Sequence, residues 1–415
     1  MARKKTHAPL DVLINGRQVG RLEKAASGAI SFRYSEEWLA WEHRFAASLS
    51  LPLTPAAYRG APVIAVFDNL LPDRDAVRRR VAERMGAQGT DFYSLLEAIG
   101  RDCVGAMQFL PEGADQAQST DIESEPVSDT EVEALLADLA RAPLGVDREQ
   151  EFRISVAGAQ EKTALLRIDG KWHRPAGVTP TTHILKPQLG QIPSADGMID
   201  MSNSVDNEHY CMTLMKAFGL SVAATEIATV GQRRVLVVER FHRHWRNAKQ
   251  ILCLPQEDCC QALGYPPTHK YQSDGGPNMK DIFGLLLRGA DDPQADAAAL
   301  FKSQILFYDV LSAQPAVDSD QIAQNRFRLA MSAGTNRHYR LNEVTGRHFV
   351  QSGKSAGLGK GLMRAAINEL MDRARDAPTV AREAMPVDFA EPVHDCIAAA
   401  LATRLPRLSS ALEEF

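Results

Sequence analysis

A glutamate and a lysine in this sequence stand where their charges require a partner. Glu208 lies on a predicted helix at 206–218 and shares a face with Cys211, Met212 and Met215. A buried unpaired carboxylate is very costly, so Glu208 needs a cation unless it reaches solvent past the edge of this apolar stripe. Lys186, at the end of an apolar strand, is the nearest candidate by residue type. Both interpretations stay open at this point.

A second acid, Asp309, is embedded in an apolar run, Leu306-Phe-Tyr-Asp-Val-Leu. A helix cap or a buried, hydrogen-bonded acid accounts for such a residue. Alternatively, Asp309 is a ligand for Mg²⁺, which prefers one or two carboxylates together with phosphate oxygens.

A loop of small residues lies between two apolar runs. Ile154 and Val156 alternate, Ala157-Gly-Ala follows, and Ala164-Leu-Leu resumes, which predicts strand, tight loop and strand. Short loops with several free N–H groups form anion-binding concavities, and Lys162 at the exit could meet the anion. The spacing matches neither dinucleotide nor Walker A patterns, so an ordinary hairpin is the alternative. A strand lysine paired with a helix glutamate after such a loop is the order found in protein kinases.

Two further positions have both a plain and a functional interpretation. Ser155, just before the loop, is either a plain strand serine or a phosphorylation site. A phosphoryl group there would place about −1.5 to −2 charges beside a triphosphate site, which is an off switch. Glu239 most simply forms an ion pair, whereas the backbone of 239–241 could line an adenine slot.

The composition narrows the class of protein. The chain has 415 residues, 45% of them hydrophobic, so two or three domains are expected. A net charge of −5 gives no global basic character for nucleic-acid binding. The six cysteines form no C-x-x-C pair, which indicates neither a disulfide framework nor a zinc site. We find no signal peptide and no apolar run that would span a membrane, so a cytoplasmic location is expected.

Local signals predict several elements of the fold. Asn15-Gly16 predicts a hairpin turn, 48–53 alternates like a strand, and a helix is expected at 75–85. Ser128 and Glu131 form a capping box that opens a helix. Further predicted elements are a strand at 181–187 stopped by proline, a hairpin across Gly231, and helices at 279–288, 296–312, 360–375, 379–384 and 389–413.

The pattern changes along the chain, with strand signals before about residue 255 and helical periods after it. This predicts an α+β fold of two lobes, with a sheet-rich N-terminal lobe and a helical C-terminal lobe. The expected divisions are an N-terminal α/β subdomain at 1–112, a polar linker at 113–130, a core with the loop and hinge at 131–254, and a helical lobe at 255–415.

The chain resembles the HipA family, the serine/threonine kinase toxins of bacterial HipBA toxin–antitoxin systems. The run Ser-Val-Ala-Gly-Ala-Gln-Glu-Lys at 155–162 is very specific to that family. Other pieces of the resemblance are residues 67–73, 99–106, 152–166, 179–186, 204–208, 254–258, 273–277 and 308–312.

The resemblance implies a two-lobed kinase-like fold that binds ATP and Mg²⁺. It implies that Ser155 is the autophosphorylated serine, Lys186 the ATP lysine with Glu208 as its ion-pair partner, and Asp309 the Mg²⁺ ligand. The implied ATP-binding residues are Val156, Ala157, Gly158, Ala159, Gln160, Glu161, Lys162, Lys186, Glu239, Arg240 and Phe241. Known members phosphorylate glutamyl-tRNA synthetase, are linked to growth arrest and persistence, and bind a small helix-turn-helix antitoxin, HipB, that sits on operator DNA.

The sequence departs from the family in one place. A HipA-like kinase carries Asp-Gly-His, followed by Lys-Asn, before its Tyr-Asp motif, whereas here Phe301-Lys-Ser-Gln-Ile-Leu runs directly into Phe307-Tyr-Asp. No Asp-Gly-His occurs in the 415 residues. The missing segment holds the aspartate that accepts the substrate proton and the asparagine that holds a metal. The apolar stretch 304–311 therefore predicts one helix across the join.

Three hypotheses follow for the function of the chain. The first is a HipA-type kinase toxin whose sequence as given lacks a loop. The second is a catalytically inactive HipA variant that binds antitoxin, and ATP, without transferring phosphate. The third is a nucleotide-binding regulatory protein with no toxin role. The absence of the general base leaves no residue to name as the catalytic one, and it favours an inactive chain.

Overall fold

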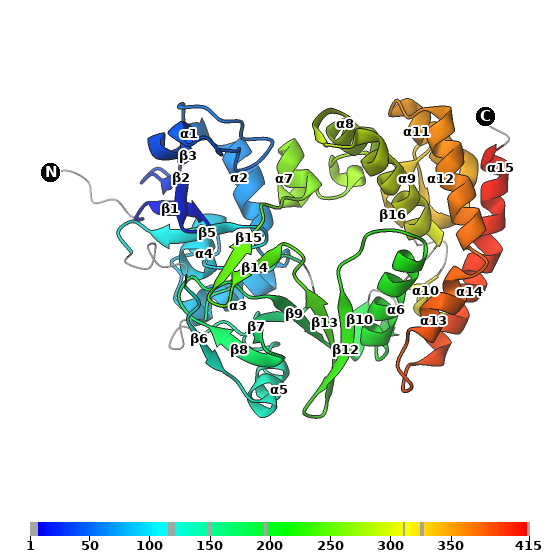
Figure 1. The fold of residues 1–415 in the computed structure, drawn as a ribbon, viewed down its shortest axis with the longest axis horizontal. Coiled ribbons are helices and arrows are strands. Elements are labelled where there is room, and N and C mark those ends of the chain that lie inside the picture. The colour runs from blue at the N-terminus through cyan, green and yellow to red at the C-terminus, as the bar shows by residue number, and fades with distance from the viewer. Residues whose placement is uncertain are drawn as a thin grey trace. The chain divides into compact units, whose positions relative to one another are not determined.

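The computed structural model describes residues 7–114, 121–147, 152–158, 160–194, 197–309, 312–323 and 328–412. These residues form two compact units. The first contains residues 1–187, 229–233 and 237–270, and the second contains 188–228, 234–236 and 271–415. The first unit is rich in strands and the second in helices, so the predicted α+β class is confirmed (Figure 1).

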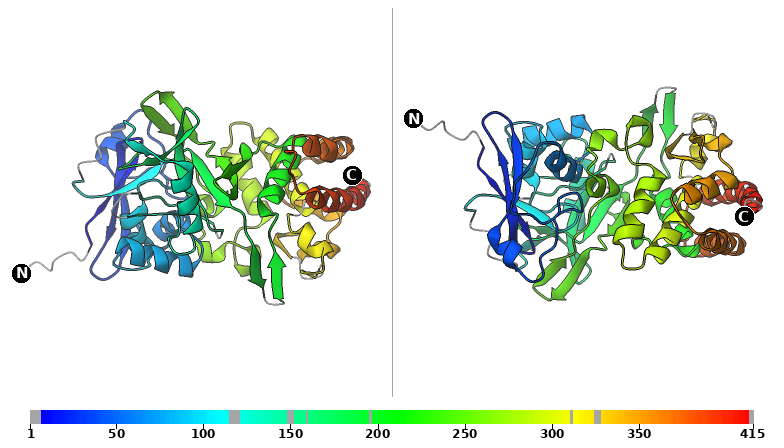
Figure 2. Two further views of the ribbon diagram at one scale, coloured as in Figure 1. Left: turned by 90° about the horizontal axis from the view of Figure 1, so that it is seen from below. Right: turned by 90° about the horizontal axis from the view of Figure 1, so that it is seen from above.

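The first unit begins with an antiparallel sheet of order β4-β3-β2-β1-β5. Its strands are β1 (Leu10–Ile14), β2 (Arg17–Lys24), β3 (Ile30–Tyr34), β4 (Tyr58–Arg59) and β5 (Met107–Pro111). The predicted turn between β1 and β2 is confirmed, because Asn15 and Gly16 have φ of 50° and 77°, the left-handed values that a type I′ turn requires. Figure 2 shows this sheet seen along its edge, with helices on one of its faces.

Short helices complete the first unit and bury the core against the sheet. They are α1 (Glu36–Ala40), α2 (Ala61–Phe67), α3 (Asp75–Met85), α4 (Phe92–Ile99), α5 (Asp129–Ala137) and α7 (Cys259–Leu263). Phe67 of α2 packs edge-on against Phe32 and Phe109, with ring centroids 5.3 and 5.5 Å apart. The predicted capping box of α5 is confirmed by reciprocal bonds between Ser128 and Glu131.

The strand predicted at 48–53 is wrong, since this segment forms turns. Its polar groups bond to another part of the chain instead of a neighbouring strand. The Ser48 hydroxyl donates to a Glu257 carboxylate oxygen at 2.6 Å, and the Leu49 N–H donates to the other oxygen at 3.0 Å. Alternation of apolar residues marked burial here, but side-chain acceptors took the place of a strand ladder.

A second, six-stranded sheet has the order β12-β13-β9-β7-β8-β6. Its strands are β6 (Ser124–Pro126), β7 (Thr163–Ile168), β8 (Lys171–Pro175), β9 (His183–Pro187), β12 (Thr225–Val230) and β13 (Arg233–Glu239). The strand stopped by Pro187 and the hairpin across Gly231 are both as predicted. A separate hairpin, β14 (Arg243–Asn247) with β15 (Gln250–Cys253), is held by Asn15, whose side-chain amide bonds both backbone groups of Cys253.

The second unit is a cluster of helices around one apolar core. Its elements are β10 (Gln191–Ser194), β11 (Gly197–Asp200), α6 (Ser204–Ala217), α8 (Met279–Gly289), α9 (Pro293–Asp309), α10 (Gln314–Asp318), β16 (Arg328–Ala333), β17 (His338–Arg340), α11 (Gly346–Ser355), α12 (Lys360–Arg373), α13 (Ala377–Glu383), α14 (Glu391–Arg404) and α15 (Ser409–Leu412). Helix α9 packs against α8 and α12, and α13 packs on α6. The fully buried rings of Phe283, Phe301 and Phe349 lie in this core.

The helices predicted in the C-terminal part are present, with one correction. The helix predicted at 389–413 is divided, because α14 ends at Arg404 and a 3-10 turn (Leu405–Leu408) containing Pro406 follows it. The division of the chain at 112, 130 and 254 stays a prediction. Within the predicted linker, the structure describes strand β6 and the start of α5, while 115–120 lie outside the described residues.

Candidate functional site: the loop at 152–158 and the hinge at 239–241

The strand predicted over Ile154 and Val156 is wrong, because residues 153–157 form no strand. The polar groups of this segment bond to two earlier segments of the chain. The Ser155 N–H donates to the Asp102 carbonyl oxygen at 2.9 Å, and the Ser155 hydroxyl donates to the Leu70 carbonyl oxygen at 2.7 Å. The second predicted strand is present as β7.

The loop after this segment closes on its own lysine. The Nζ of Lys162 donates to the Ala157 carbonyl oxygen at 2.8 Å, and Lys162 is buried. Gly158 has φ of 111°, and a β-carbon added there would lie 2.6 Å from that Nζ. The loop therefore needs glycine at 158 for its backbone, whereas the flexible end of Lys162 could move away from a β-carbon. Gln160 and Glu161 are half-buried, and Ala159 lies outside the described residues.

The three residues of the predicted hinge, 239–241, differ in their exposure to solvent. Glu239 at the end of β13 is exposed and Phe241 is 60% exposed, whereas Arg240 is buried. The Arg240 N–H donates to the Thr182 carbonyl oxygen at 2.9 Å. The Arg240 side chain lies in a buried network, and its carbonyl oxygen accepts from the Arg243 N–H at 2.9 Å.

That network is centred on Asp102, which the sequence analysis did not single out. The Asp102 carboxylate accepts from Arg240 and from Arg243 at 2.7 Å each, and from the N–H and hydroxyl of Thr181 at 3.0 and 2.7 Å. Both guanidiniums also donate to the Cys103 carbonyl oxygen, at 2.6 and 2.8 Å. The three charged side chains are 5% exposed or less.

The charges of this network shift its titrating groups. Burial opposes ionisation of Asp102, but the two guanidiniums and Thr181 outweigh it, so the pKa of this carboxyl lies below its usual value. Burial and repulsion by Arg243 lower the pKa of Arg240 to about 10, against the attraction of Asp102. Burial and the positive charges of Arg243 and Arg240 lower the pKa of His242 to about 3, so this imidazole is neutral.

One feature of the sequence could have indicated this network. Arg240 and Arg243 are two cations three residues apart, and they follow the buried run Val235–Val237 after two intervening residues. Asp102 stands three residues after the end of another largely buried element, α4. Charges that close apolar runs indicate buried pairs, but nothing local in the sequence says that these two segments meet.

The other predicted site residues are placed in different parts of the molecule. Lys186 lies half-buried on β9 of the first unit, and Glu208 lies half-buried on α6 of the second. Their ion pair stays a prediction. Asp309 is the last residue of α9, and its side chain is not described.

Helix α9 runs without interruption across the place where the family carries its catalytic segment. Leu306 and Tyr308 are buried, Phe307 is 62% exposed, and the Tyr308 hydroxyl donates to the Val344 carbonyl oxygen at 2.7 Å. The prediction of one helix across the join is correct up to Asp309; 310 and 311 lie outside the described residues.

The described residues contain no cluster of three or more His, Cys, Asp or Glu side chains that could hold a metal ion. No helix among them is long and apolar enough to cross a bilayer.

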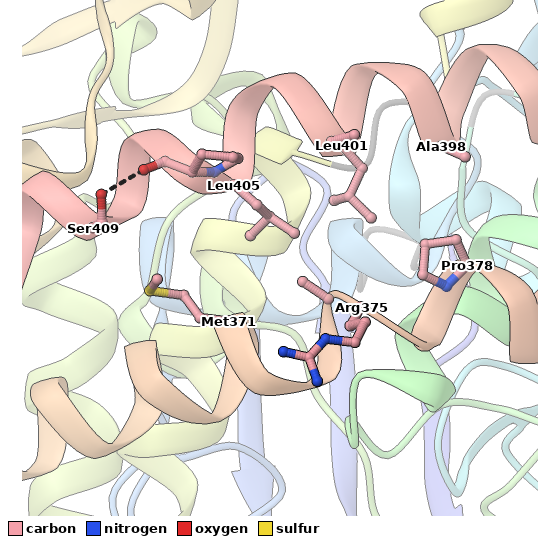
Figure 3. Close-up of a pocket in the computed structure, with 10 residues that line it drawn as sticks. Met371, Arg375, Pro378, Ala398, Leu401, Leu405 and Ser409 are labelled. Carbon is pink, nitrogen blue, oxygen red and sulfur yellow. Dashed lines mark hydrogen bonds between the residues drawn. The ribbon is translucent and has the colours of Figure 1, made fainter.

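A pocket of about 380 Å³ lies in the second unit. Figure 3 shows Met371, Leu401 and Leu405 facing it, with the Arg375 guanidinium at its edge. None of the predicted site residues lines this pocket.

Comparison with known proteins identifies the family to which the chain belongs. Residues 10–110 match the HipA N-terminal domain, and residues 154–308 match the HipA-like C-terminal domain. A putative kinase of Sinorhizobium fredii, Y4mE, is 33% identical over 393 residues, which cover 89% of this chain and 90% of that protein. The serine/threonine-protein kinase toxin HipA of Shewanella oneidensis is 28% identical over 278 residues, or 66% of this chain and 60% of the toxin.

The fold agrees with a solved structure from that family. The complex of Shewanella oneidensis HipA, HipB and operator DNA contains a chain that matches this one with a TM-score of 0.76 and 21% identity, over 97% of this chain and 99% of that one. The fold is thus the two-part, HipA-like arrangement of sheet-rich and helical regions. This chain belongs to the HipA family of kinase toxins.

Proposed function

We propose that this chain binds ATP and Mg²⁺ as HipA kinases do, but that the sequence as it stands does not transfer phosphate. The residues proposed to bind ATP are Val156, Ala157, Gly158, Ala159, Gln160, Glu161 and Lys162 of the loop, Lys186, and the backbone of Glu239, Arg240 and Phe241. Lys186 pairs with Glu208 in this proposal, and Asp309 holds the metal.

The fit of the loop to a triphosphate rests on its own chemistry. Its side chains are small around Gly158, and it holds a buried lysine next to that glycine. A loop of this kind lets backbone N–H groups approach phosphate oxygens, and a lysine adds a positive charge. When bound, Mg²⁺ would supply neutralisation of the phosphate charge.

The proposal that the chain does not transfer phosphate rests on one observation, the uninterrupted helix α9. No residue of Phe301–Asp309 replaces the aspartate that accepts the substrate proton, or the asparagine that holds a metal. Phosphoryl transfer depends almost entirely on positioning and electrostatics, so the loss of both groups removes the activity.

The proposed partners come from the relatives. The Shewanella oneidensis complex contains HipB and operator DNA. We extend this to a HipB-like helix-turn-helix antitoxin and, through it, to operator binding and repression in the cytoplasm. An active chain would phosphorylate glutamyl-tRNA synthetase and Ser155, which is the alternative function and leads to growth arrest and persistence.

The test combines binding and transfer on the same protein. We expect calorimetric titration to show Mg²⁺-dependent ATP binding, and [γ-³²P]ATP to label neither the chain nor glutamyl-tRNA synthetase. The intact mass should show no phosphate on Ser155. Labelled product from this sequence would establish the active kinase instead, and absence of ATP binding would remove the nucleotide proposal altogether. Co-purification of a small DNA-binding protein tests the partner.

A further inference from the structure

The segment that leads into the phosphate loop is held by the N-terminal domain. Its backbone at Ser155 donates to the Asp102 carbonyl oxygen, its hydroxyl donates to the Leu70 carbonyl oxygen, and Gly158 forms an isolated parallel bridge with Pro72. Leu70, Pro72 and Asp102 all fall within the residues that match the HipA N-terminal domain. The loop itself falls within the match to the other domain.

The hinge is held by the same part of the N-terminal domain. Arg240 bonds the Asp102 carboxylate and the Cys103 carbonyl oxygen. Arg243, three residues beyond, bonds the same two groups and donates to the Gly105 carbonyl oxygen at 2.6 Å. Gly105 has φ of 73°, and a β-carbon there would lie 2.6 Å from the Gln256 carbonyl oxygen, so this turn has no room for a side chain.

Asp102 therefore serves both segments through two different groups. Its backbone carbonyl binds the loop and its carboxylate binds the hinge. The carboxylate is the single acid that bonds the two buried guanidiniums in the described residues, so the hinge depends on it electrostatically. Thr181, next to the Thr182 that accepts from the Arg240 N–H, donates twice to the same carboxylate.

We propose that Asp102 is a positioning residue of the nucleotide site, through which the N-terminal domain fixes the loop at 152–158 and the hinge at 239–241 relative to each other. This inference rests on the proposed ATP site. Loss of the carboxylate frees Arg240 and Arg243 from their shared acid, so the hinge moves. The chain at 102 then shifts with its carbonyl, so the loop loses the bond at Ser155 at the same time.

A merely structural ion pair makes a different prediction, and the chain offers a matched control. Asp206 on α6 is buried to the same extent as Asp102, with 4% and 5% of the side chain exposed, and it binds Arg234 through two contacts of 2.8 Å. Both residues of this pair belong to the second unit. Asp206→Asn removes a buried carboxylate that makes no bond to the network around Asp102, and Arg234 keeps its second acid, Asp388.

The experiment compares Asp102→Asn with Asp206→Asn by amide hydrogen exchange without nucleotide. We expect Asp102→Asn to accelerate exchange at 153–158 and at 239–243 together, by about tenfold, while α12 and α14 keep their protection. Asp206→Asn should leave both segments as in the wild type. Acceleration spread evenly over the whole chain, or confined to one of the two segments, overturns the proposal.

A second variant and a second readout keep the test decisive. Thr181→Val keeps every charge and removes the hydroxyl that donates to the carboxylate and accepts from Arg240. It should therefore accelerate the same two segments by a smaller factor even where Asp102→Asn does not fold. ATP affinity should fall about tenfold in Asp102→Asn. If the wild type binds no ATP, the proposed function fails, whereas the exchange comparison still decides whether Asp102 couples loop and hinge.

Discussion

The hydroxyl of Ser155 donates a hydrogen bond to the carbonyl oxygen of Leu70 across 85 residues of sequence, in a place that solvent does not reach. A phosphoryl group on this oxygen would bring about −1.5 to −2 charges and remove the donated proton. An isolated charge cannot be buried there without great cost. Modification of Ser155 is therefore compatible with the loop only after the segment 152–158 has left this position.

Substitution of Ser155 tests this consequence. Ser155→Ala removes the hydrogen bond that the hydroxyl donates to the Leu70 carbonyl oxygen. It should therefore lower the free energy of unfolding by about 1–3 kcal/mol. ATP binding should be kept. Ser155→Glu places a carboxylate in the same site, so it should release the segment and abolish ATP binding. Urea unfolding and ATP titration measure the two effects. Equal ATP affinity in both variants would contradict the displacement of the loop.

Gly158→Ala should weaken ATP binding for a reason that lies in the backbone. At φ of 111°, an L-residue costs about 1–3 kcal/mol, whereas the clash with Lys162 Nζ is relieved by movement of a flexible side chain. We therefore expect the double variant with Lys162→Ala to be no more stable than Gly158→Ala alone. Gly190→Ala is the control, because a β-carbon there meets no atom of the described residues within 4 Å. Urea unfolding measures these stabilities. A double variant that is more stable than Gly158→Ala alone would show that the clash with Lys162 dominates.

The stability of the protein should fall as the pH is lowered below about 6.5. The folded state holds His242 neutral, with its pKa lowered to about 3, while the unfolded chain takes up a proton near the ordinary histidine value. The unfolded state then binds more protons, so the free energy of unfolding decreases between these two pH values. The depressed pKa of Asp102 acts in the same direction at lower pH, since its stabilisation is lost as that carboxyl protonates.

Urea unfolding over a pH series measures this slope. His242→Gln should flatten it between about pH 6.5 and pH 4, because the variant has no imidazole to protonate on unfolding. His269→Gln, at an exposed position of the same unit, is the control and should keep the wild-type dependence. An unchanged slope in His242→Gln would assign the pH dependence to other groups.

A double-mutant cycle in ATP affinity tests the proposed pair of Lys186 and Glu208. Lys186→Met should weaken ATP binding by about tenfold, and Glu208→Gln should do so through the lysine that it orients. In the double variant, the loss should be no larger than in Lys186→Met alone, since the two residues act as one. Lys216→Met, an exposed lysine on the same helix as Glu208, controls for the change of charge. Fully additive losses of ATP affinity would show that the two residues act independently.

The parts of the fold that could be predicted from sequence depend on neighbours in the chain. The Asn15-Gly16 turn, the capping box of Ser128 and Glu131, and the bounds of α3 follow from local chemistry, and each is present as expected. The strands predicted at 48–53 and over Ile154 and Val156 are wrong for a shared reason. Alternation reports burial on one side, but Ser155 and Leu49 find their bonding partners in distant segments.

The residues of the candidate site also differ in whether local sequence predicts them. Gly158 and Lys162 stand in one short run, so their proximity was predictable, and the structure adds that Lys162 binds the Ala157 carbonyl oxygen. Asp102 lies in a stretch that resembles the family, but its role cannot be predicted locally, because it depends on cations that lie well over a hundred residues further on. No periodicity or spacing brings such residues together; only the folded chain does.

The separation of these partners also bears on how the protein folds. Asp102 meets Thr181 across 79 residues, Arg240 across 138 and Arg243 across 141. Contacts of such long range form slowly, because the entropy of closing the intervening chain must be overcome first. During synthesis the acid emerges long before either of its cations, and a chain interrupted before Arg240 has neither of them. The carboxylate bonds that hold the hinge are therefore completed late, whereas the bonds that Ser155 makes to Leu70 and Asp102 need only the earlier part of the chain, so a nascent chain can support the loop before the hinge.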